Sequence, residues 1–245
     1  DEINGVETGS GADIRLKAGS RTTVKGHIEG ADDFNGIITL TVRDNRELVT
    51  CRLNDKTAAD TPFTYYDRPN TLYNGSDSVR NGRFELNFVV PKDINYSNST
   101  GIINLYAINS SHTVIANGHD ESFIVGGSDI AENDSIGPSI YCYLNSPSFQ
   151  NGGDVNSTPY FVAQIMDKDG INATGNGIGH DMQLIIDGKQ AYTYSLNDNF
   201  TFDFGSYTSG TTYYNIPELP EGKHKLQFRA WDVLNNVSIA ELSFN

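Results

Sequence analysis

Apolar and polar residues alternate along much of the chain, and this alternation predicts strands rather than helices. Every second residue of Phe84–Val90 is apolar, and the same period of two marks Tyr160–Met166 and Lys223–Trp231. Because successive side chains of a strand point to opposite faces, the pattern is typical of strands with one buried face. No segment predicts a convincing helix, and only the letters GIGHD are compatible with one short helical turn.

The first half of the chain contains many short segments of this kind. Strands are expected at Ile14–Ala18, Ser20–Ile28, Ile37–Arg43, Glu47–Leu53, Phe63–Asp67, Phe84–Val90, Ile102–Ile108, Thr113–Ala116 and Glu121–Val125. Between them, Asn54–Pro62 is expected to be a loop and Asn70–Gly75 a turn region. The pair Asn81-Gly82 is a tight-turn signal, because glycine accepts a positive φ. Residues 1–12 are polar and glycine-rich, which indicates a linker.

The segment Gly126–Gly137 loses the alternation, is acidic, and is expected to link two domains. A second set of strands is expected after it, at Ser139–Leu144, Tyr160–Met166, Gln183–Ile186, Ala191–Leu196, Thr211–Ile216, Lys223–Trp231 and Ser238–Phe244. Many strands with turn signals every 8–12 residues, roughly, are the signature of an immunoglobulin-like sandwich. The predicted fold is therefore all-β, with two tandem immunoglobulin-like β-sandwich domains. The predicted boundaries are a linker over 1–12, a first β-sandwich over 13–126, a linker over 127–137 and a second immunoglobulin-like β-sandwich over 138–245.

The composition is typical of a strand-rich protein, and the net charge argues against nucleic acid and anionic lipid as partners. The chain of 245 residues has 24 Gly, 13 Tyr and 12 Phe, and it lacks long runs of helix-forming residues. Its formal net charge of −14, from 31 acidic against 17 basic residues, predicts that it repels nucleic acid and anionic lipid. The acids are scattered, which is typical of a soluble, non-sticky surface. No apolar run approaches the length of a membrane span.

Acidic and amide side chains gather in two loops of the last third of the chain. One is DKDGINATGNGIGHD, over Asp167–Asp181, and the other follows the strand Lys223–Trp231. In an immunoglobulin-like sandwich these two loops lie at the same end, and end loops are where binding usually occurs. We therefore expect a contact end there, with the candidate residues Asp167, Asp169, Asn172, Asp181, Trp231, Asp232 and Asn236. Trp231 lies on the strand face opposite Leu226 and Phe228.

Two interpretations of these loop residues stay open. Oxygen ligands on a flexible loop suit calcium, but the start Asp167-Lys168-Asp169-Gly170 does not continue with calcium-loop spacing and ends without a Glu. Asp and Asn also cap their own turns, and this second interpretation is favoured. We assign no metal and no cofactor. Burying unpaired carboxylates is costly, so a partner of these loops should offer Arg, Lys, N–H groups or a cation.

The residues for a peptidase or hydrolase site are not grouped in this sequence. The two cysteines, Cys51 and Cys142, lie far apart, which predicts neither a disulfide framework nor a metal cluster. Cys142 falls within Ile140–Leu144, where a small core residue is expected. His119-Asp120 and His180-Asp181 could each pair a base with its orienting acid, but no nucleophile accompanies either pair. No catalytic residue is therefore assigned.

Four stretches resemble one family. They are TTVKGHIEG with the following DFNG (Thr22–Gly36), NGRFELNFVVPKDINY (Asn81–Tyr96), GINATGNGIGHD (Gly170–Asp181) and EGKHKLQFRAWDVLNN (Glu221–Asn236). The chain resembles the C-terminal part of the PorU family, the surface sortases of the type IX secretion system in Bacteroidetes, which are gingipain-like cysteine peptidases. In that family the peptidase domain precedes this region and holds the catalytic His and Cys. No position here matches their motifs.

The resemblance implies a role and a place for the chain. It would be a non-catalytic accessory module, at the cell surface and outer membrane on the extracellular side. Its partners would be the upstream peptidase domain of the same protein and an outer-membrane β-barrel protein. A second interpretation, from another class, is a free-standing adhesin or carbohydrate-binding surface protein. An exposed line of Tyr or Trp on one sheet face would favour the second.

Overall fold

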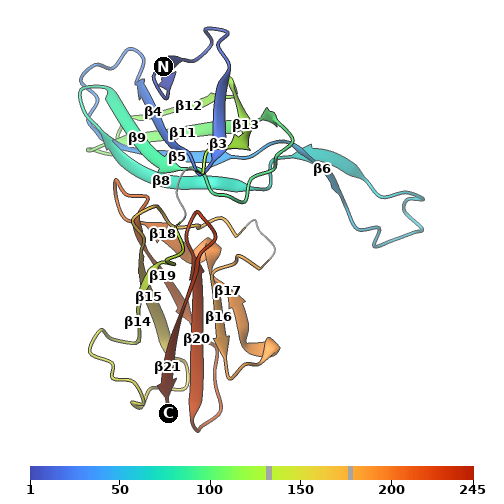
Figure 1. The fold of residues 1–245 in the computed structure, drawn as a ribbon, viewed down its shortest axis with the longest axis vertical. Helices are drawn as coiled ribbons and strands as arrows, with labels where there is room; N and C mark the ends of the chain where they lie inside the picture. The colour runs from blue at the N-terminus through green and yellow to red at the C-terminus, as the bar shows by residue number, and fades with distance from the viewer. Residues whose placement is uncertain (131–133, 176–178) are drawn as a thin grey trace.

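The structure, a computed structural model, describes residues 1–130, 134–175 and 179–245. The chain has an all-β sandwich fold, and the two sandwiches are stacked end to end (Figure 1). Each encloses its own cluster of buried apolar side chains. In the described residues the only helical elements are two 3-10 turns, η1 (Gln190–Tyr192) and η2 (Asn197–Asn199). No helix among those residues is long and apolar enough to cross a membrane.

The first sandwich pairs two four-stranded sheets around a core that includes Leu40, Phe88 and Phe123. Its strands are β1 (Glu2–Ile3), β2 (Val6–Glu7), β3 (Ile14–Ala18), β4 (Arg21–His27), β5 (Gly36–Arg43), β6 (Glu47–Thr50), β7 (Thr64–Asp67), β8 (Thr71–Val79), β9 (Arg83–Val89), β10 (Ser99–Thr100), β11 (Ile102–Asn109), β12 (Ile115–Asp120) and β13 (Phe123–Ser128). The sheets have the orders β2-β1-β4-β9 and β12-β11-β5-β8. A smaller sheet, β10-β13-β3, and the separate pair β6-β7 complete this half.

The second sandwich has the strand arrangement of an immunoglobulin-like domain. Its strands are β14 (Ser139–Leu144), β15 (Tyr160–Met166), β16 (Gln183–Ile186), β17 (Thr193–Ser195), β18 (Phe200–Phe202), β19 (Ser209–Asn215), β20 (His224–Trp231) and β21 (Val237–Phe244). The first, second, sixth and fifth strands in order along the chain form one sheet, β14-β15-β19-β18, and the other is β17-β16-β20-β21. This division of strands between two antiparallel sheets is that of immunoglobulin sandwiches.

One predicted turn region is a strand, which corrects the sequence analysis. Asn70–Gly75 was expected to be a turn region, but most of it belongs to the nine-residue strand β8. The strand pairs along its whole length with β5, and polar side chains bond across the pair. The Thr39 and Ser76 hydroxyls are 2.9 Å apart, and the Thr41 hydroxyl donates to Asn74 Oδ1 at 3.2 Å. Pairing with an apolar partner strand thus overrides the local turn preference.

The expected linker over residues 1–12 is also partly wrong. Strands β1 and β2 form a small hairpin, and β1 pairs with β4 through Glu2 opposite Lys25 and Ile3 opposite Val24. The side chain of Ile3 is buried in the first core. One buried isoleucine, together with backbone pairing to an existing sheet edge, is enough to order a segment that composition alone marks as a linker.

The division into two domains near 127–137 stays a prediction, and proteolysis can test it. The connecting sequence has no Lys or Arg but contains Glu132, whereas the exposed loop of the β6–β7 pair contains Arg52 and Lys56. We expect a Glu-specific protease to release two folded fragments, because cleavage there separates the two cores. Trypsin has no cleavage site in the connecting sequence, so it should cut only exposed loops such as that of the β6–β7 pair and leave one species in size-exclusion chromatography. A Glu-specific digest in which neither fragment stays folded would contradict the division.

Candidate functional site

The two loops predicted to share one end of the second sandwich do meet. We call residues 167–175, 179–181 and 232–236 the pole. The backbone N–H of Asn172 donates to the carbonyl of Trp231 at 3.0 Å, and Ile171 forms an isolated β-bridge with Asp232. The immunoglobulin-like topology thus places the loop after β15 beside the loop after β20. Residues 176–178 of the predicted loop lie outside the described residues.

Most acidic side chains of the pole bind their own loops. Asp232 accepts hydrogen bonds from the backbone N–H of Leu234 at 2.9 Å and of Asn236 at 2.7 Å, and from the Asn236 amide at 2.7 Å. Asp167 Oδ1 accepts from the backbone N–H of Asp169 at 2.8 Å. Such bonds hold a turn closed without any external ligand. Within the part of the chain that the structure describes, no three His, Cys, Asp or Glu side chains are grouped to hold a metal ion.

Two buried carboxylates of the pole are harder to ionise than usual. Burial raises the pKa of Asp167 to about 6, and the nearby charges of Asp232 and Asp169 add to that rise. Burial likewise raises the pKa of Asp232, against the opposing effect of its bonds from Asn236. A carboxylate that loses water without gaining a cation is less stable in its charged form. The pole is therefore less stable at neutral pH than in mild acid.

Replacing Asp167 with Asn should remove the part of this pH dependence that comes from Asp167. A pKa raised on folding means that the folded state binds the proton more tightly, so stability is full below about pH 4 and falls as the pH rises through about 6. We expect Asp167→Asn to be about 1 to 3 kcal/mol more stable than wild type at about pH 7 and to have no advantage at about pH 4. Urea unfolding across this range measures both, with the exposed Asp60→Asn as control. Equal stability of the variant and the wild type at both pH values would contradict the raised pKa of Asp167.

The pole also contacts the first sandwich, and one carboxylate is the centre of that contact. Asp93, in the loop after β9, accepts from the Asn172 amide at 3.2 Å and from the Asn235 amide at 2.8 Å. His180 Nδ1 lies 2.5 Å from the same carboxylate. The Asp93 side chain is only 12% exposed. Three side chains of the second sandwich thus converge on one acid of the first.

Backbone bonds and ring contacts extend the contact between the sandwiches. The N–H of Lys92 donates to the carbonyl of Val233 at 2.8 Å. Farther along, the ring of Tyr73 on β8 lies 5.2 Å from that of Phe202 on β18, and its hydroxyl donates to the carbonyl of Ser206 at 3.3 Å. Tyr73 is buried, so part of the first core extends across the contact. The sequence analysis did not anticipate Asp93 or Tyr73, since neither has a partner nearby in sequence.

The remaining candidate residues, each within the described ranges, form no hydrogen bond with Asp93. Trp231 is half-buried, its ring lies 4.4 Å from that of His180, and its indole N–H has no hydrogen-bond partner among the described residues. Asp169 binds Lys168, which also reaches Asp134 at 3.0 Å. Asp181 is half-buried and immediately precedes Met182 and β16. The candidate residues thus share one end of the sandwich, but only Asn172 bonds directly to Asp93.

A second candidate surface is a projecting hairpin, which we call the arm (residues 47–67). Strands β6 and β7 pair only with each other, and the arm extends away from the first sandwich (Figure 1). It exposes large apolar side chains, with Phe63 69% and Tyr66 63% exposed, and Leu48 and Tyr65 exposed as well. The sequence predicted both strands but not that they pair with no other strand. Alternation shows which residues share a face of a strand, but not which other strands or sheets lie beside it.

The chain matches a solved structure over its full length. That structure is the crystal structure of dimeric latent PorU from Porphyromonas gingivalis, with 38% sequence identity and a TM-score of 0.59. The chain is a PorU-related region. The match covers 100% of this chain and 23% of the PorU chain, so the chain spans less than a quarter of that protein. No protein-family model and no curated protein matches the chain.

The thiols of this PorU-related chain are not arranged as peptidase nucleophiles. Cys142, on β14, is half-buried, and its burial raises the pKa of the thiol to about 11. Cys51 is exposed in the arm. Among the described residues, no hydrogen bond joins either cysteine to a histidine. His224 instead binds Asp187 at 2.9 Å and the carbonyl of Pro220 at 2.8 Å.

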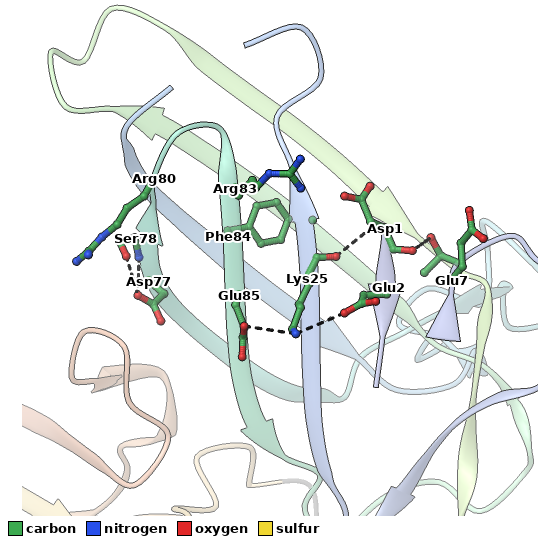
Figure 2. A pocket seen from close by; sticks show the side chains of 12 residues that line it. Asp1, Glu2, Glu7, Lys25, Asp77, Ser78, Arg80, Arg83, Phe84 and Glu85 are labelled. Atoms are coloured by element: carbon green, nitrogen blue, oxygen red, sulfur yellow. Dashed lines mark hydrogen bonds and ion pairs between the residues drawn. The ribbon is translucent and has the colours of Figure 1, made fainter. Parts of the chain in front are cut away.

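The first sandwich of the PorU-related chain also contains a broad hollow. Its volume is about 1020 Å³, and it lies where β1, β4 and β9 come together (Figure 2). Phe84 lies against Gly26 within it, and Lys25 bridges Glu2 at 3.5 Å and Glu85 at 3.6 Å. Neither a cysteine nor a histidine lines it. We assign no reaction to this hollow.

Proposed function

We propose that this chain is a non-catalytic accessory module of a cell-surface, gingipain-like cysteine peptidase of the type IX secretion sortase kind. The observation that carries the proposal is the match to PorU, which spans this whole chain but only 23% of the PorU chain. The module supports the catalytic domain and mediates protein contacts. It works at the outer membrane, on the extracellular side, beside the upstream peptidase domain and an outer-membrane β-barrel partner.

Two features support the contact role. The arm presents two strands with unpaired outer edges and exposed aromatic side chains, and unpaired strand edges pair readily with a partner strand. Exposed Tyr and Phe are also typical of residues that contribute most to protein interfaces. The pole, in turn, is proposed as the contact end of the second sandwich, where the bonds to Asp93 fix its position relative to the first.

The non-catalytic role can be tested on the chain itself. We expect no turnover of peptide substrates and no labelling by a cysteine-peptidase active-site probe, because the Cys142 thiol is half-buried and Cys51 lacks a paired base. The control is the parent protein under the same conditions. Turnover by the chain that disappears in Cys51→Ala or Cys142→Ala would refute the proposal.

The contact role can be tested with the peptidase domain encoded upstream of Asp1, produced separately. We expect it to bind this chain, and we expect the arm variant Phe63→Ser/Tyr66→Ser to weaken the Kd about tenfold or more, since such anchors each contribute substantially. The matched control is Tyr106→Ser, an exposed tyrosine on β11 of the sandwich body. Equal loss of binding in both variants, or no binding by wild type, would contradict an arm-mediated contact with that domain.

A further inference from the structure

One outer face of the second sandwich is a tyrosine surface. It is the side of the sheet β14-β15-β19-β18 that points away from the core. Its residues are Ser139, Tyr141, Tyr143, Tyr160, Val162, Gln164, Met166, Thr201, Ser209, Thr211, Tyr213 and Asn215. We call this set the tyrosine face. It is separate from the pole and the arm.

The four tyrosines form two ring pairs on this face. Tyr143 and Tyr213 both lie directly opposite Val162, one on each neighbouring strand. Val162 is only 8% exposed although it points away from the core, which shows that the flanking rings cover it. Tyr141 lies 5.7 Å from Tyr143, and Tyr160 lies 6.0 Å from Tyr213, between ring centroids. With strands about 4.8 Å apart, Tyr143 and Tyr213 are about 10 Å apart across the sheet.

The charge of the tyrosine face is unlike that of the rest of the chain. None of its residues, all of which the structure describes, is acidic or basic, in a chain with a net charge of −14. The outer face of the other sheet offers a direct comparison. It pairs Lys225 with Glu241 at 2.8 Å and Arg229 with Gln183 at 3.2 Å, as an ordinary solvated face does. The tyrosine face therefore suits an uncharged partner.

We propose that the tyrosine face binds a neutral polysaccharide chain. The C–H groups of a pyranose ring form an apolar surface that packs on an aromatic ring, as other apolar groups do. Two rings on separate strands can each stack on a different sugar ring of one extended chain. In the neighbouring rows of the sheet, Gln164 lies opposite Thr211 and Asn215 lies opposite Tyr160, and these polar side chains offer amide and hydroxyl groups that can bond to sugar hydroxyls.

The same chemistry disfavours a protein as the occupant. Protein interfaces are enriched in Phe, Met and Arg as well as Tyr, and these residues surround a desolvated apolar centre. The tyrosine face has no Leu, Ile, Phe or Arg, its single Met, the exposed Met166, lies at the end of β15, and its central Val162 is already covered. Its hydroxyl and amide groups would instead need partners wherever they were buried. A sugar chain supplies such partners at every residue. The proposal does not depend on the proposed function.

Affinity electrophoresis of the whole chain in native gels tests the proposal. The gels would contain soluble starch, hydroxyethyl cellulose, galactomannan or xylan as neutral probes. We expect at least one to retard the wild-type chain. Tyr143→Ala/Tyr213→Ala should weaken that binding about tenfold or more, because each lost stacking contact weakens binding several-fold. Tyr143→Phe/Tyr213→Phe keeps both rings and should retain most of the binding, which controls for folding.

The opposite sheet provides the matched surface control. Ile239→Ala removes an exposed apolar side chain there and should leave retardation unchanged. The proposal is overturned if no probe retards the wild type, or if the alanine pair binds as well as wild type while it keeps its Tm. It is also overturned if sedimentation shows that the face joins two copies of the chain, with the dimer lost in the alanine pair.

Discussion

Replacing Phe228 with Ala is expected to destabilise the second sandwich by about 3 to 5 kcal/mol. Phe228, on β20, is fully buried, and its ring lies 5.2 Å from that of Phe161 on β15. The two rings come from opposite sheets, so together they fill the middle of the core. Removing one leaves a cavity that rigid strands cannot close, and this adds to the lost burial of apolar surface. Urea unfolding followed by circular dichroism measures the change.

The control for this prediction comes from the same sheet. Ile239→Ala, on β21, removes a side chain that is 58% exposed, and it should change stability by about 0.5 kcal/mol or less. The contrast separates a core effect from a general sensitivity of the sheet. A loss for Phe228→Ala no larger than that for Ile239→Ala would mean that the two sheets do not pack through this aromatic pair.

Replacing Asp93 with Ala is expected to lower the free energy of unfolding by about 2 to 4 kcal/mol, and the two sandwiches should then unfold independently. The substitution leaves the amides of Asn172 and Asn235 without their shared acceptor, and it removes the bond to His180. Losing an acceptor from a mostly buried cluster costs more than the bonds contributed, because the remaining donors stay dehydrated. Calorimetry of the variant should then resolve two separate unfolding transitions, because each sandwich keeps its own core. The wild type should show a single transition or two that lie closer together.

Two variants distinguish the role of Asp93 from a general charge effect. Asp93→Asn keeps a hydrogen-bond acceptor but removes the charge. Its free energy of unfolding should therefore lie between those of the wild type and Asp93→Ala. Asp60→Ala removes an exposed acid of the arm and should change nothing measurable. If Asp93→Ala unfolds with an unchanged calorimetric profile, the pole does not hold the sandwiches together.

The position of the pole could be predicted from the sequence, but its partner in the first sandwich could not. The alternation in Tyr160–Met166 and Lys223–Trp231 identified two strands of one sandwich, and their order along the chain placed the following loops at one end. In the structure these loops are joined by the bond from Asn172 to Trp231. Topology transfers from sequence in this way because few strand orders are compatible with a sandwich. The partner of the loops, Asp93, could not be found, because 79 residues separate it from Asn172.

Alternation by itself determined that this chain is all-β, where most of its strands lie, and which side chains of each strand share a face. Only the tertiary structure decided what lies against each face. In the structure most of the segment Asn70–Gly75 is part of a strand, and no other sheet of the described residues covers the arm. Tyr141 and Tyr213 are exposed. The physical reason is that a period of two is a local property of the backbone. Burial, by contrast, depends on strands paired across long sequence separations, and each pair is stabilised only once its partner is in place.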